Sequence, residues 1–209
     1  MFKSFESGEQ VNVARRQEID TAAKVFYISS GYVGVYIGTG KHRQMLVMMK
    51  EGNTFPLALT SDVPLWQSEV YYKTMSDSVL HVISRQDYLR TRDKMGKKEL
   101  EQELFVKTRG NSTLMERVVN LMTNDISRKL YMRLIYLADF LDAIQGDTAV
   151  LSMPLTYVDI AESIGTTRET VNRLITSLQN EGVLSVNKRI ITINSLSKLE
   201  QLFKATSST

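Results

Sequence analysis

The segment that most constrains this chain runs from Leu155 to Ile193, where helix caps, a tight-turn glycine and two short strands follow at fixed spacing. Thr156 lies three residues before Asp159, which is the spacing of a capping box and predicts the start of a helix. Gly165 falls where a tight turn between two helices needs a residue that tolerates a positive φ. The pattern therefore predicts two helices joined by a short turn.

The second helix of this pair is predicted to be amphipathic. A hydroxyl at Thr166 or Thr167 can cap its first turn. The apolar residues recur at helical spacing and predict a buried face: Val171, Leu174, Ile175 and Leu178. The opposite face is polar and charged: Arg168, Glu169, Asn172 and Arg173.

A hairpin is expected directly after this helix. Gly182 is typical of a helix stop, and residues 183–186 and 190–193 alternate as two short strands joined at Asn187-Lys188-Arg189. Ala161 is small enough for the two helices to cross closely. Two helices followed by such a wing predict a winged helix-turn-helix, the architecture that lays one helix in the DNA major groove.

The run Arg168-Glu169-Thr170-Val171-Asn172-Arg173 resembles the Arg-Glu-Thr-Val-x-Arg start of the recognition helix in the Crp/Fnr family of bacterial transcription regulators. The resemblance implies that Arg168 and Arg173 donate to guanine and Glu169 accepts from cytosine, with Asn172 at the variable base-reading position. It assigns phosphate contacts to four residues: Thr167, Thr170, Lys188 and Arg189. Taken singly, Arg168, Glu169 and Arg173 are more typical of a solvated surface than of DNA binding, and Lys188 and Arg189 fit either interpretation equally. The combination with caps, turn and hairpin favours DNA binding.

Residues 1–95 have a different pattern, with short apolar segments separated by Gly31, Gly40 and Gly52. The predicted strands are 25–28, 33–37, 45–49, 70–72 and 79–83. They predict an all-β barrel or roll, and their spacing resembles the cyclic-nucleotide-binding β-roll of Crp/Fnr proteins. The expected fold is α+β, with a β-roll sensor domain (1–95), a dimerisation helix (96–125) and a winged helix-turn-helix domain (126–209).

The loop at residues 52–69 departs from the cyclic-AMP-responsive members, which hold the cyclic phosphate with an Arg-Ser or Arg-Thr pair. It contains no arginine or lysine, and a buried phosphate needs a compensating cation or a nest of N–H groups. This argues against cyclic-AMP binding and leaves open an apolar or amphipathic small ligand, haem, or no ligand. Candidate pocket residues, which could equally fill the core, are Leu57, Leu59, Leu65, Trp66 and Leu114. His42 and His81 are the only histidines; because a lone strand histidine is more often packed or exposed, no cofactor is expected.

Residues 98–124 predict a long helix that carries a coiled-coil seam. Its members alternate at spacings of four and three: Leu104, Thr108, Asn111, Met115, Val118 and Met122. The family resemblance makes this the dimerisation helix. Glycine costs about 1 kcal/mol in a helix interior, so both a continuous helix and one restarted between Gly110 and Thr113 remain open. A further helix is expected over 127–144, ended by Gly146-Asp147, and the basic run 90–98 is expected to be a solvated linker.

Composition narrows the function further. A net charge of +3 permits nucleic-acid binding without arguing for it, and the absence of cysteine excludes disulfides and thiolate metal sites. No apolar run reaches the roughly 20 residues of a membrane span and no signal-peptide pattern opens the chain. We expect a cytoplasmic homodimer, not an enzyme, that binds double-stranded DNA at inverted repeats. The resemblance implies TGTGA-like half-sites and RNA polymerase as a partner. The competing hypothesis is a ligand-sensing or protein-interaction module with degenerate DNA binding.

Overall fold

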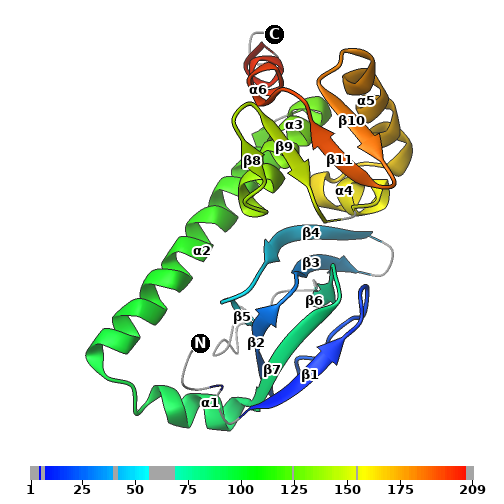
Figure 1. Ribbon diagram of the computed structural model, residues 1–209. Helices are drawn as coiled ribbons and strands as arrows, with labels where there is room; N and C mark the ends of the chain where they lie inside the picture. Colours follow the sequence, from blue (N-terminus) through cyan, green and yellow to red (C-terminus); the bar gives the residue numbers. More distant parts are fainter. Residues whose placement is uncertain are drawn as a thin grey trace. The chain divides into compact units, whose positions relative to one another are not determined.

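The structure, a computed structural model, describes residues 5, 8–39, 42–56, 69–123, 125–153 and 155–205 (Figure 1). It divides into two compact units, residues 1–117 and 118–209. The division falls inside one long helix, which therefore contributes residues to both units.

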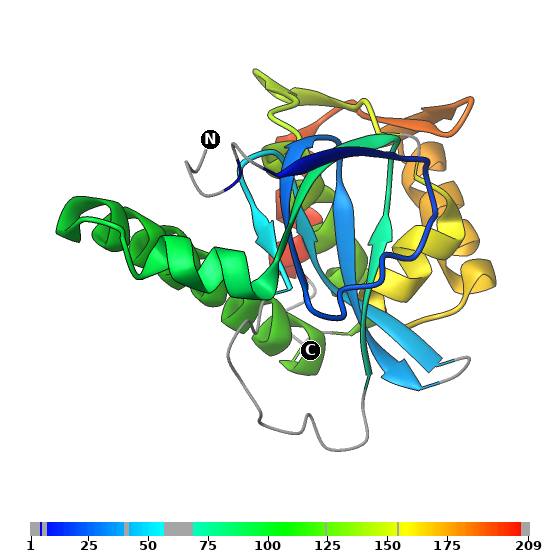
Figure 2. The ribbon, with the colours of Figure 1, turned by 90° about the horizontal axis from the view of Figure 1, so that it is seen from below.

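The first unit is built on two antiparallel sheets (Figures 1 and 2). In the first sheet the strand order is β1 (Glu9–Val13), β7 (Ser78–Ser84), β2 (Lys24–Ser30), β5 (Thr54–Phe55). In the second it is β4 (His42–Met49), β3 (Val33–Thr39), β6 (Glu69–Thr74). All five predicted strands lie within these elements. Sequence reasoning missed β1, in which only Val11 and Val13 alternate with polar residues, and β5, which has only two residues.

Strand β2 is buried on both faces, because successive side chains of a strand point to opposite sides. Phe26 and Ile28 belong to the core cluster that also contains Phe55 and Tyr72, and the Phe55 ring stacks at 5.0 Å from the rings of Phe26 and Tyr72. Tyr27 belongs to a second cluster on the other face. The continuous apolar run of this strand is thus explained by two cores.

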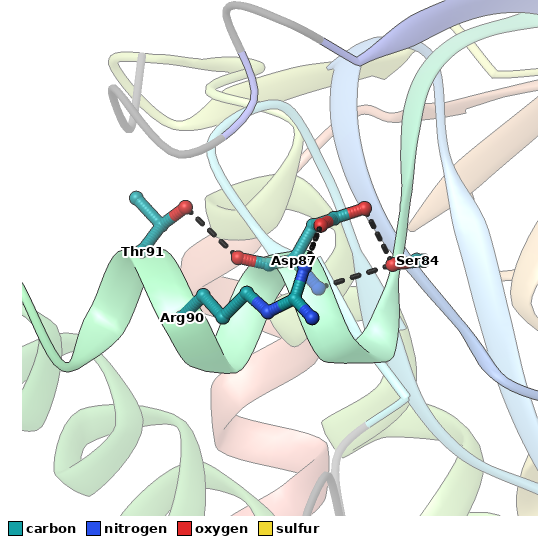
Figure 3. A network of polar contacts seen from close by, with 4 residues as sticks. All are labelled: Ser84, Asp87, Arg90 and Thr91. Carbon is teal, nitrogen blue, oxygen red and sulfur yellow. Dashed lines mark hydrogen bonds and ion pairs between the residues drawn. The ribbon is translucent and has the colours of Figure 1, made fainter.

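The basic run 90–98 is not the linker that the sequence indicated. Helix α1 (Arg85–Arg92) covers its beginning, and the next helix starts at Lys97. Ser84 caps α1: its Oγ accepts from the Asp87 N–H at 3.0 Å and donates to the Asp87 carboxylate at 2.6 Å, while Arg90 lies 3.5 Å from the same carboxylate (Figure 3). Only Tyr88 of this helix is buried, so its apolar pattern was too weak to recognise.

Helix α2 (Lys97–Thr123) is uninterrupted, and no restart occurs between Gly110 and Thr113. Its described side chains include an unusual set of large exposed apolar residues: Leu104, Phe105, Met115, Val118, Val119 and Met122. Such a set of exposed apolar side chains on one helix is typical of an interaction surface.

The second unit contains four helices and a four-stranded sheet of order β10-β11-β9-β8 besides the end of α2. These elements are α3 (Ile126–Phe140), β8 (Ile144–Gln145), β9 (Thr148–Leu151), α4 (Tyr157–Ile164), α5 (Arg168–Asn180), β10 (Leu184–Asn187), β11 (Ile190–Ile193) and α6 (Leu196–Ala205). Leu130, Leu134 and Leu137 of α3 are fully buried and form the floor of its core.

The prediction of a helix reaching residue 144 was wrong. Helix α3 ends at Phe140, and Asp142 turns the chain with a φ of 52°. Gly146 and Asp147 form the two-residue turn of the β8–β9 hairpin, in which Gln145 pairs with Thr148. Gly146 has a φ of 62°, so the glycine serves a hairpin turn and not a helix stop.

Asp147 joins this turn to the start of α6. Its carboxylate accepts from the Ser197 N–H at 2.7 Å and from the Ser195 hydroxyl at 2.8 Å, and its carbonyl accepts from the Leu196 N–H at 2.7 Å. These hydrogen bonds, with that from the Ser197 N–H the strongest, lower the pKa of Asp147 below its ordinary value. The hairpin therefore caps a helix that begins about fifty residues later.

Candidate DNA-binding surface

Helix α4 starts and stops where the sequence predicts. The Thr156 hydroxyl accepts from the Asp159 N–H at 3.2 Å, and the Asp159 carboxylate accepts in return from the Thr156 N–H at 2.8 Å, which completes the capping box. Gly165 ends the helix in the left-handed region at a φ of 69°, and its N–H donates to Ala161. Ala161 and Ile160 are buried, so α4 serves as the support on which the next helix lies.

Helix α5 separates an apolar face from a polar one. Val171, Ile175 and Leu178 are at most 1% exposed, whereas Leu174 is half-buried. The four residues predicted to read bases all lie on the exposed side: Arg168, Glu169, Asn172 and Arg173. The apolar face packs against the core of the unit. This packing orients the helix, so the charged face points to solvent.

The start of α5 is organised by two threonines to which the sequence assigned phosphate contacts. Thr167 is the N-cap, and its hydroxyl oxygen accepts from the Thr170 N–H at 3.2 Å. The two threonine hydroxyls lie 3.1 Å apart. Exposed Thr167 therefore stands at a helix N-terminus, where backbone N–H groups favour an anion.

The wing is a tight hairpin beside α5 (Figure 1). Asn187 pairs with Ile190, which leaves Lys188 and Arg189 as its two-residue turn. Their φ values are 47° and 71°, in the left-handed region that glycine and asparagine prefer. Both side chains are exposed, so the tip presents two cations on a strained backbone.

Sequence reasoning missed three elements of the scaffold: helix α6 and the strands β8 and β9. Strand β9 pairs with β11 (Ile191 with Leu151, Ile193 with Ala149) and widens the wing into a sheet. A signal was present, because Ala149 and Leu151 are buried and alternate with exposed Val150. The pattern is only four residues long, and Gly146-Asp147 directly before it is interpreted from the sequence as a helix stop.

The residues of the predicted seam and pocket are only partly described. Leu104, Met115, Val118 and Met122 are exposed on α2, while the side chains of Thr108 and Asn111 lie outside the described residues. Leu114 is half-buried on the same helix, and the other pocket candidates lie outside the described residues: Leu57, Leu59, Leu65 and Trp66. Gly40 and the side chain of His42 also lie outside them. His81 is half-buried, with its ring 6.4 Å from that of Tyr27.

Two further searches cover only the part of the chain that the structure describes. No helix there is long and apolar enough to cross a membrane. No group of three or more histidine, aspartate or glutamate side chains there could hold a metal ion.

An α4–turn–α5 pair followed by a β-hairpin wing defines a winged helix-turn-helix domain. Residues 128–202 match the Crp-like helix-turn-helix domain family, and nearly the whole chain, roll included, has the fold of Crp/Fnr-type regulators. FixK2 from Bradyrhizobium japonicum superposes with a TM-score of 0.73 at 18% identity, covering 93% of this chain and 96% of that one. A Crp/Fnr-family transcriptional regulator from Thermus thermophilus gives a TM-score of 0.70 at 18% identity, covering 95% and 100%. An anaerobic regulatory protein of Bacillus subtilis is 22% identical over 194 residues, 88% of this chain and 80% of that protein.

Proposed function

We propose that this protein is a transcription regulator that binds an inverted-repeat DNA site as a homodimer, with α5 of each copy in the major groove. The observation that carries the proposal is that α5 has a buried apolar face and an exposed charged face. Val171, Ile175 and Leu178 of its apolar face are buried, and Arg168, Glu169 and Arg173 are exposed at the end that begins at the N-cap. In helix-turn-helix domains it is this end of the second helix that meets base edges.

Each exposed residue has a role that follows from its chemistry. Arg168 and Arg173 donate to the O6 and N7 atoms of guanine, Glu169 accepts from the N4 amine of cytosine, and Asn172 contacts a neighbouring base edge. The resemblance of this run to the family motif supports TGTGA-like half-sites. Phosphates are held by Thr167 and Thr170 at the helix start and by Lys188 and Arg189 at the wing, which fixes register without reading sequence.

A second copy of the chain is the proposed occupant of the exposed apolar residues of α2. Leu104, Met115, Val118 and Met122 follow the spacing of a coiled-coil seam and are all exposed. Two copies joined there would carry two α5 helices, suited to half-sites about 34 Å apart on the DNA. This match between a symmetric dimer and a symmetric site supports an inverted repeat.

The remaining assignments rest on the sequence. The cation-free loop 52–69 supports an effector other than cyclic AMP, or none, and neither a cofactor nor an enzymatic activity is proposed. RNA polymerase is the proposed protein partner, because a regulator bound beside a promoter acts through it, and the place of action is the cytoplasm.

Selection from random double-stranded DNA tests the proposal. The expected product is an inverted repeat of guanine-containing half-sites with centres about 10 base pairs apart. Direct repeats, or no enriched motif, would refute it. Arg168→Ala is expected to relax the preference at one guanine by about 1–3 kcal/mol. Lys188→Ala is its matched control: all sequences weaken alike, and the slope of log affinity against log salt falls by about one.

A further inference from the structure

Methionine carries all the sulfur chemistry of this chain, because the sequence has ten methionines and no cysteine. Burial divides the methionines that the structure describes. Met115 and Met122 are 66% and 80% exposed. The others are half-buried or buried: Met45, Met48, Met49, Met75, Met95, Met132 and Met153. Among the described methionines of a free chain, an oxidant in solution therefore reaches the two on α2 first, since thioether oxidation follows exposure.

Met115 and Met122 also lie together. They are seven residues apart in the uninterrupted helix α2, close to two full turns, so their side chains project from the same side. Val118 lies between them in the same stripe and is exposed as well. The two thioethers thus occupy equivalent places in the predicted seam.

We propose that Met115 and Met122 form an oxidation site at which peroxides break the dimer; the effect on assembly rests on the homodimer proposed above. In each reaction the thioether sulfur attacks one oxygen of hydrogen peroxide and the O–O bond breaks. That oxygen stays on sulfur as the sulfoxide, and the other leaves as water with both hydrogens. Sulfur loses two electrons and the peroxide gains them.

The sulfoxide weakens the dimer because the part of the seam that follows polar Asn111 has only apolar members, Met115, Val118 and Met122. The S=O oxygen of Met122 needs a hydrogen-bond donor, and Val118, the seam member one turn before it, offers none from its side chain. A symmetric dimer would bury four sulfoxides. A single buried polar group without a partner weakens association by at least about tenfold.

The core of the protein is shielded from the same chemistry. Met45 and Met75 are at most 2% exposed, and the Met75 sulfur accepts a hydrogen bond from the Tyr36 hydroxyl at 3.1 Å. Mild oxidation therefore leaves the roll folded. Because the seam covers Met115 and Met122 in the dimer, free chains oxidise faster, and the oxidation rate falls as protein concentration rises.

The test treats the full chain with hydrogen peroxide, at a protein concentration low enough that free chains are present, and follows three readouts: peptide mass mapping, oligomeric state by light scattering, and circular dichroism. The first oxygens are expected on Met115 and Met122, with the dimer dissociation constant raised at least about tenfold and the circular dichroism unchanged. Methionine sulfoxide reductases should restore the dimer, since they reverse this modification. Earlier oxidation elsewhere, or a dimer that survives oxidation at both residues, overturns the proposal.

Two variants make the test specific. Met115→Leu/Met122→Leu is compared with itself before and after peroxide, and its dimer dissociation constant should not change. Met95→Leu/Met132→Leu is the matched control and should remain as sensitive as the parent chain. The reverse result for either pair overturns the proposal. An untreated chain that is monomeric at every concentration refutes the homodimer and this inference together, whereas an untreated dimer that resists oxidation refutes this inference alone.

Discussion

We expect Lys188 and Arg189 at the wing turn to lower the stability of the fold and to raise its affinity for DNA. Lys188 and Arg189 both have positive φ, at 47° and 71°, and a left-handed conformation costs an ordinary L-residue about 1–2 kcal/mol. Asn-Gly is the sequence best suited to such a turn. The double variant Lys188→Asn/Arg189→Gly relieves most of this cost. Because glycine has greater backbone entropy in the unfolded chain, it also lowers the free energy of unfolding by about 0.5–1 kcal/mol, which offsets part of the gain. The expected net gain in the free energy of unfolding is about 1–2 kcal/mol.

Urea denaturation followed by circular dichroism measures this gain. With a slope near 2 kcal/mol per molar urea, the midpoint of the transition that reports the second unit should rise by about 0.5–1 M. DNA affinity should fall at the same time. Because each phosphate contact contributes about 0.9 to the slope of log affinity against log salt, loss of two cations should reduce that slope by about 1.8.

A matched variant separates charge from backbone strain. Lys188→Gln/Arg189→Gln removes both cations but keeps two L-residues at positive φ, so the salt slope should fall equally without a gain in stability. If the Asn-Gly variant is no more stable than the parent chain, the strain argument is refuted. If its salt slope is unchanged, the wing cations do not contact phosphates.

Three further outcomes are expected. Asp147→Asn should destabilise the second unit at neutral pH. In the parent chain this contribution should be present above the ordinary pKa of 3.8 and lost as the pH falls through the lower folded value, so the urea midpoints of parent and variant should converge in acid. Thr156→Ala should cost about 0.5–2 kcal/mol in urea denaturation by removing the α4 cap, and an unchanged midpoint would contradict the capping role. Ile175→Ala should cost about 2–5 kcal/mol through a cavity beneath α5 and lower DNA affinity in a gel-shift assay; full affinity would show that the buried face does not position the helix.

The helix-turn-helix was predictable because its determinants are local. A capping box needs only Thr156 and Asp159, three residues apart, and Gly165 is required by the φ of a single position. The amphipathic spacing of α5 lies within one element. Geometry of this kind is determined by residues that are close in the sequence, and the structure confirms the prediction at each of these positions.

The parts that sequence reasoning missed depend on distant partners. Gly146-Asp147 resembles a helix stop until the contact with Ser197, fifty residues later, shows what the aspartate caps. The edge strand β1 has only a short apolar signal, half-buried Val11 and Val13 on either side of exposed Asn12, and its place in the sheet is set by pairing with distant β7. Arg133 is 2% exposed. Its burial depends on the packing of α3, which the residue type does not reveal.

Because α2 is unbroken, an insertion within it would rotate the exposed apolar residues on one side of the insertion relative to those on the other. Each added residue rotates the following part of the helix by about 100° about its axis. Two residues inserted near Gly110 would place Leu104 nearly opposite Met115 and Met122, whereas seven would restore the alignment to within about 20°. Homologous chains that differ in length within this helix should therefore differ by multiples close to whole turns.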